Sequence, residues 1–243
     1  MNIMSRIINN VLTVLLFMAL VASPGIAMKH EMGSGHGMTM HHQHITLNHA
    51  LGMALEGSNL VMLGQMGMSP GIDEESVNHG KMMIKNGREM WNEVMSGETM
   101  KQMHGAGKSP SDDPQMKFTH ELAEAQLKVI EFLSKHSDMT GHTMAVHHQH
   151  LMLNHALKMA LEGSNLVMIG QMGMAPGIDE KDIDHGKMMI KNGRDLYDKI
   201  MSGETMTKMH KEGKTPMDDA GMKFTHELAE AELKVISLLE SMQ

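Results

Sequence analysis

The stretch LNHALGMALEGSNLVMLGQMG at residues 47–67 recurs as LNHALKMALEGSNLVMIGQMG at residues 153–173. In the first copy, Leu51, Leu55 and Met62 share one face of a helix with 3.6 residues per turn. The face that we expect to meet water carries polar residues: Asn48, Glu56 and Asn59. The stretch therefore predicts a long helix with one apolar face.

The similarity extends well beyond this helix. Residues 41–137 align with residues 147–243 without a gap, at an offset of 106, and 67 of those 97 positions are identical. A period of this length predicts a duplicated domain and not a short solenoid repeat. The expected organisation is a signal peptide, a leader, a repeat, a linker and a second repeat, at residues 1–27, 28–40, 41–134, 135–146 and 147–243.

Glycine, proline and acidic caps divide each copy into three long helices and one short helical segment. In copy one, the long helices are expected at about 41–65, 74–95 and 112–133, and the short segment at 98–104. Asp73 is the expected N-cap of the second helix, where Gly80 and Gly87 share a face that lets another helix come close. No stretch alternates like a strand. We expect an all-α fold, a tandem duplicated helical bundle, with the copies in one bundle or in two.

The N-terminal segment has the pattern of a secretory signal peptide. Arg6 precedes an apolar run at residues 11–22, and Gly25 and Ala27 supply the small residues of a cleavage site. We therefore expect a periplasmic or secreted protein with no membrane attachment after cleavage. Loss of Arg6 would change the net charge from −8 to −9, which argues against nucleic acid and anionic membranes as partners.

All the sulfur in this chain is in methionine side chains. There are 33 methionines and no cysteine, so disulfides and thiolate metal sites are excluded. The chain also holds 18 histidines but only six aromatic residues, counting four Phe, one Trp and one Tyr. Methionine, usually a minor core residue, is a principal apolar residue here.

Methionine and histidine recur three or four residues apart, the spacing that places two ligands on one helical face. In copy one the candidate metal ligands are His42, His49, Met53, His79, Met82, Met83, Met100, Met103, His104, Met116 and His120. In copy two they are His148, His155, Met159, His185, Met188, Met189, Met206, Met209, His210, Met222 and His226. The groups at His79 and Met116 lie at the edge of an apolar stripe, where a desolvated site between helices is expected.

Each of these residues also has a plain structural interpretation. A single methionine on an apolar stripe is more often core than ligand, and a lone buried histidine is more often simply hydrogen-bonded. The pairing at four places in one copy favours metal binding. Duplication preserves the pairs, so the second copy adds no independent support.

Two less regular clusters add further ligands at residues 28–44 and, more sparsely, 136–150. Cleavage after Ala27 would leave Met28-Lys29-His30 at the N-terminus. Its amine, two backbone amides and the His30 imidazole would form a square-planar nitrogen site suited to copper(II) or nickel(II).

Ligand softness indicates which metal ion is expected. Thioether sulfur binds copper(I) and silver(I) better than hard ions, and imidazole binds copper in either oxidation state. We therefore expect copper as the bound metal, chiefly copper(I), with silver(I) or copper(II) as alternatives. The expected partners are metal ions and a copper exporter or another periplasmic copper protein.

The His-x-x-Met-Met and Met-x-x-x-His pairs resemble the motifs of periplasmic silver- and copper-resistance binding proteins. The setting is also similar to the helical-bundle copper-storage proteins, with methionine and histidine in place of their cysteines. This resemblance covers motif style and composition. It implies sequestration, storage or delivery of a monovalent metal, without enzymatic activity.

Two other functions are compatible with the pattern. One is electron transfer through haem b held by Met/His ligation in a helical bundle. The other is a structural or interaction domain with an adaptable methionine-rich surface. No nucleophile–base motif stands out, so an enzyme is not expected.

Overall fold

The computed structural model describes residues 35–67, 71–98, 100–101, 114–136, 144–173, 175–203, 206–207 and 220–242. His36–Gln243 form one compact unit. The predicted signal peptide and most of the predicted leader lie outside the described residues.

The described chain contains long helices and no strand, which confirms the predicted all-α bundle. The long helices are α2 (Gly35–Met66), α3 (Glu74–Ser96), α5 (Pro114–His136), α6 (Met144–Met172), α7 (Glu180–Met201) and α9 (Ala220–Ser241). None of them is long and apolar enough to cross a membrane.

Local capping explains where the outer helices begin. Asp73 is the N-cap of α3, as predicted, and its side chain accepts a hydrogen bond from the Ser76 amide at 2.9 Å. Asp179 caps α7 in the same way and forms a reciprocal capping box with Asp182. The start of α2 was predicted less well, because the helix begins at Gly35 and not near residue 41. The end of the predicted flexible leader, including Met40, is therefore helical.

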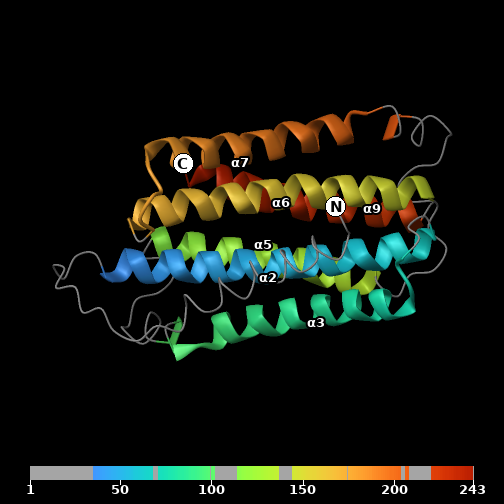
Figure 1. Cartoon of the computed structure of the whole chain (residues 1–243), viewed down its shortest axis with the longest axis horizontal. Helices are drawn as coiled ribbons and strands as arrows, with labels where there is room; N and C mark the ends of the chain where they lie inside the picture. The colour runs from blue at the N-terminus through green and yellow to red at the C-terminus, as the bar shows by residue number, and fades with distance from the viewer. Residues whose placement is uncertain are drawn as a thin grey trace. The chain divides into compact units, whose positions relative to one another are not determined.

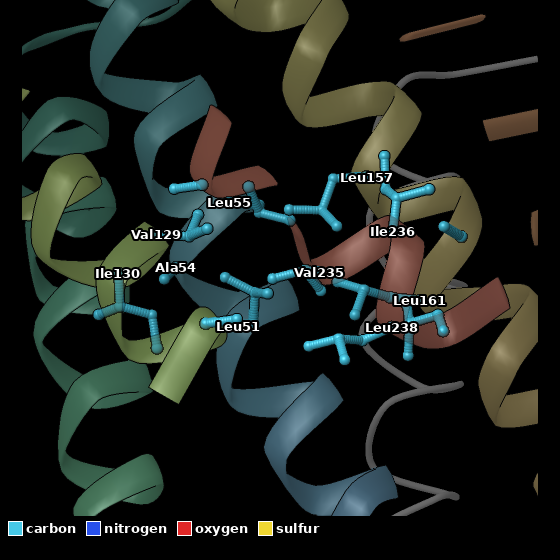
Figure 2. Packing of buried hydrophobic residues seen from close by; sticks show 14 of the residues in the cluster. Leu51, Ala54, Leu55, Val129, Ile130, Leu157, Leu161, Val235, Ile236 and Leu238 are labelled. Atoms are coloured by element: carbon cyan, nitrogen blue, oxygen red, sulfur yellow. The ribbon is translucent and has the colours of Figure 1, made fainter. Parts of the chain in front are cut away.

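The two copies share one bundle, the alternative that the sequence left open. Helices α2, α5, α6 and α9 form its centre, whereas α3 packs on the first copy and α7 on the second (Figure 1). Leu51 and Leu55 of α2 pack in one apolar cluster with Leu157 and Leu161 of α6 and Val235 of α9 (Figure 2). Neither copy encloses a core of its own.

A row of amides joins α2 to α6, and here the prediction of a water-facing side was wrong for Asn48, although Glu56 on the same predicted side is exposed. Asn48, expected to be exposed, is 1% exposed because α6 covers that face of α2. Its side-chain Nδ2 donates to Asn165 Oδ1 at 2.8 Å, and Asn154 Nδ2 donates to Asn59 Oδ1 at 2.7 Å. These two contacts show that α2 and α6 run antiparallel.

One position in this buried row differs in charge between the copies. Gln126 Nε2 donates to Asn48 Oδ1 at 2.7 Å. The aligned residue in copy two is Glu232, which is completely buried, and both its carboxyl oxygens lack a hydrogen-bond partner. Asn154 Oδ1, the counterpart of the Asn48 acceptor, also lacks one. Burial raises the pKa of Glu232 well above its ordinary value, so the protonated carboxyl is the form suited to donate to Asn154.

Glycines set the spacing between the outer and central helices, as predicted for Gly80 and Gly87. A Cβ on these two residues would lie 2.6 Å and 2.5 Å from backbone carbonyl oxygens of α2. In α7, a Cβ on Gly186 or Gly193 would lie 2.7 Å or 2.6 Å from carbonyl oxygens of α6. Backbone atoms cannot move aside as a flexible side chain can, so these contacts require glycine.

We predict that Gly87→Ala lowers the free energy of unfolding by about 1–3 kcal/mol, because the added methyl group collides with the α2 backbone. Gly52→Ala is the matched control, since its Cβ would have no atom within 4 Å. This exposed-side substitution should instead stabilise α2 by about 0.5–1 kcal/mol. Urea unfolding measures both values. Equal effects of the two substitutions would contradict the close approach of α2 and α3.

We also predict that Glu232→Gln removes a fall in stability that begins as the pH rises above the ordinary Glu pKa. A carboxyl whose pKa is raised in the folded state stabilises that state at low pH. This contribution is lost as the pH rises from the ordinary Glu value towards the raised one, with a slope of at most about 1.4 kcal/mol per pH unit. Urea unfolding from about pH 5 to pH 8 should show this downward slope as the difference in stability between wild type and variant. Gln126→Glu should steepen it, and identical slopes in wild type and Glu232→Gln would refute the role of this carboxyl.

Candidate metal centre

At one end of copy one, methionines form a cluster apart from the leucine-rich core. Met40, Met100 and Met116 are 4%, 2% and 2% exposed, and the half-buried Met95 packs against them. We call these four residues the methionine cluster. Among the described residues, every apolar side chain of this cluster is a methionine, whereas the buried residues of the main core are Leu, Val, Ile, Ala and aromatic residues. Met95 also packs against the main core.

Four chain segments bring these thioethers together. Met40 lies in the second turn of α2, Met95 in the last turn of α3, and Met116 in the first turn of α5. Gly97 ends α3, and the Lys101 amide donates to the Gly97 carbonyl oxygen at 3.1 Å. This turn places Met100 back against the end of the bundle. The cluster is thus made by loop geometry and helix ends, not by the spacing within one helix.

His44 lies beside the cluster on α2, in an environment that fixes its tautomer. Its Nε2 is 2.8 Å from Thr119 Oγ1, and that hydroxyl donates its single hydrogen to the Gln115 carbonyl oxygen at 2.9 Å. The hydroxyl must therefore accept a hydrogen bond from Nε2–H, which leaves the lone pair on Nδ1. Phe118 packs edge-on against the ring, with 5.6 Å between centroids.

The free nitrogen of His44 is poised as a ligand. His44 is 5% exposed, and its Nδ1 is buried without a hydrogen-bond partner. Burial, and to a lesser degree the charge of His41, lowers the pKa of His44 to about 4, so its imidazole is neutral at neutral pH. A ring held through one nitrogen with a lone pair on the other is the usual arrangement of a metal-binding histidine.

A cavity of about 170 Å³ adjoins these residues. We call it the histidine pocket, and it is lined by Met40, His41, His44, Gln115, Phe118, Gln171 and Met242. The Nδ1 atom of His41 is also buried without a hydrogen-bond partner, and burial followed by the charge of His42 lowers the pKa of His41. Met40 belongs both to the lining of this pocket and to the methionine cluster.

The second copy repeats part of this arrangement. His150 Nε2 lies 2.8 Å from Thr225 Oγ1, which donates to the Gly221 carbonyl oxygen at 2.8 Å. Met206 is 1% exposed, but the position of Met40 is taken by Val146. Copy two therefore lacks one of the four thioethers at the aligned positions.

The predicted ligands differ widely in burial. Three are buried: Met100, Met116 and Met206. Six are half-buried: Met53, Met83, His120, Met159, Met189 and His226. Eight are exposed: His42, His49, His79, Met82, His148, His155, His185 and Met188. His30, Met103, His104, Met209, His210 and the side chain of Met222 lie outside the described residues.

The expected desolvated site between helices is not found at His79 and Met82. Both side chains are exposed, and Met82 is 56% accessible. They fall on the outer face of α3 because Gly80 and Gly87 occupy the face that meets α2. At Met116 the expectation of a desolvated environment is confirmed, although the side chain packs with Met40 and Met100.

Sequence analysis includes Met40, His41 and His44 only as part of the irregular cluster at residues 28–44, not as members of a defined site. It misses Met95, which has no part in that cluster or in the helical Met/His pairs. Across the described residues, no three His, Asp or Glu side chains gather in a possible metal site. Any site here must therefore include sulfur or other donors.

Comparison of the chain with protein-family models, with curated proteins and with solved structures gave no match. Inference about function therefore rests on the residues of the site.

Proposed function

We propose that this chain is an exported protein that binds a soft monovalent metal ion, copper(I) or silver(I), at the methionine cluster. Its role would be sequestration, storage or delivery of that ion. The observation that carries the proposal is the meeting of four methionines from four chain segments in a cluster that, within the described part of the chain, contains no other apolar residue. Export is supported by the signal-peptide pattern of residues 1–27.

The chemistry of the thioether fits this role. Thioether sulfur has lone pairs but no proton to lose, so it binds soft ions without a change in its own charge. A thioether cannot form a disulfide, unlike the thiolates that serve soft metals elsewhere. Three sulfur atoms withdrawn from water would also disfavour hard ions, which need oxygen ligands or their own hydration shell.

Packing alone accounts less well for the cluster. Methionine fills irregular gaps, but it is flexible and specifies a core poorly compared with leucine. The main core of this protein uses leucine, valine and isoleucine in the usual way. Methionine is concentrated in a cluster of its own. This cluster lies next to a histidine whose lone pair points away from its hydrogen bond. Both features favour a role for the methionines as metal ligands.

The test is anaerobic titration with copper(I) in competition with a colorimetric copper(I) chelator. We predict that Met40→Leu/Met100→Leu/Met116→Leu lowers the affinity of the tightest site at least tenfold, because leucine keeps the volume but has no lone pair. The control is Met62→Leu/Met168→Leu, which replaces two methionines, each 1% exposed, outside the cluster. Swaps between Met and Leu usually cost less than about 1.5 kcal/mol, so both variants should fold.

Wild-type affinity in the control and a loss in the cluster variant would support the proposal. If the cluster variant binds copper(I) as tightly as wild type does, the proposal is overturned. Failure of wild type to compete for copper(I) would also overturn it, and would favour a structural role for the methionines.

A further inference from the structure

The histidine pocket has the ingredients of a second site, different in kind from the methionine cluster. Two residues of its lining, His41 and His44, each have an Nδ1 atom that is buried and has no hydrogen-bond partner. Two methionines, Met40 and Met242, also line it. A buried imidazole nitrogen without a partner is costly, so a bound group would stabilise it.

We propose that the histidine pocket binds a second soft metal ion, copper(I) or silver(I), through His41 Nδ1, His44 Nδ1 and the thioether of Met40. This inference rests on the proposed function, because it assigns a further site for the same class of ion. Two imidazoles and one thioether form a mixed nitrogen–sulfur donor set, which suits copper better than any hard cation.

The geometry supports the assignment of each donor. His41 and His44 are three residues apart on α2, so both side chains lie on one face. The bond from His44 Nε2 to Thr119 Oγ1 turns Nδ1 away from α5 and holds the ring in place. Thr119 thus acts as the outer hydrogen-bond partner that a metal-binding imidazole normally has.

Residues of the second copy complete the pocket. Gln171 lies near the C-terminal end of α6 and Met242 just after α9. They reach the beginning of α2 because α2 and α6 are antiparallel. The pocket is therefore a product of the fused bundle, and an isolated first copy would lack this wall.

Sharing of Met40 links the two sites. This residue belongs to the methionine cluster and also lines the pocket. Met40, Met100 and Met116 are almost entirely withdrawn from water, whereas His41 at the pocket is half-exposed.

The second copy supplies a natural comparison. His147 and His150 align with His41 and His44, but Val146 stands at the position of Met40 and His136 at the position of Met242. The aligned positions thus keep the two histidines and lose both thioethers. Substitution of His147 and His150 is accordingly the matched control for substitution of His41 and His44.

The test uses silver(I) as a redox-inert probe with the full-length protein labelled with ¹⁵N at histidine. We predict that silver(I) shifts the Nδ1 resonances of His41 and His44, while the Nε2–H of His44 stays bonded to Thr119. The same shifts should persist in Met100→Leu/Met116→Leu, which weakens the cluster but keeps Met40. His41→Gln/His44→Gln should bind one silver ion fewer than wild type, and His147→Gln/His150→Gln should bind as many as wild type.

The outcomes separate this inference from the proposed function. If silver(I) binding depends on Met100 and Met116 but no resonance of His41 or His44 shifts, the pocket site is overturned and the cluster site is supported. Shifts at the two histidines that persist after loss of cluster binding would support the pocket on its own. Absence of silver(I) binding by wild type would overturn both. The wild-type spectrum needs no variant, so the pocket site stays testable if His41→Gln/His44→Gln does not fold.

Discussion

Asparagine pairs between α2 and α6 set the register on which the rest of the structure depends. Asn48 bonds to Asn165 and Asn154 bonds to Asn59, and in each pair one amide is buried and the other half-buried. A shift of one helix along the other would leave these buried amides without partners, at a cost of about 1–3 kcal/mol each. Leucine contacts depend less on register. The polar pairs therefore select one alignment of α2 and α6 from several that would bury a similar apolar area.

That register decides which residues meet at the end of the bundle. Antiparallel α2 and α6 bring the end of the second copy beside the beginning of α2, where Met40, His41 and His44 lie. On the first copy's own side, Gly97 ends α3 and the turn after it returns Met100 to the same region. A site of sulfur and nitrogen donors thus forms from the helix ends, while the middle of the bundle is ordinary apolar core.

The sequence predicted the elements better than the site. Asp73 marked the start of α3, and Gly80 and Gly87 marked its close approach to another helix. Both signals come from residues within one copy, so the sequence of that copy is enough to predict these two features. Asn48 was assigned to the solvent side because a helical wheel cannot show that a second copy covers that face. Met95 is missed, and Met40 and His44 are placed only in an irregular cluster, for a related reason. Spacing within one helix detects pairs on that helix, whereas the candidate donors come from four segments and meet only in three dimensions.

The two copies also differ where the chemistry is proposed. Val146 replaces Met40, and Glu232 replaces Gln126 in the buried polar row. If the thioethers served only to fill space, we would expect residues of similar size at positions 40 and 146, because their surroundings are equivalent. Methionine and valine differ in size. In the metal-binding account, the first copy holds the fuller donor set and the second keeps a reduced one.

The most direct measurement is anomalous diffraction from crystals of the full-length protein loaded with one equivalent of silver(I). The account predicts that the strongest silver peak lies among the sulfur atoms of Met40, Met100 and Met116. A peak confined to exposed groups such as His79 and Met82, with none at the methionine cluster, would contradict it.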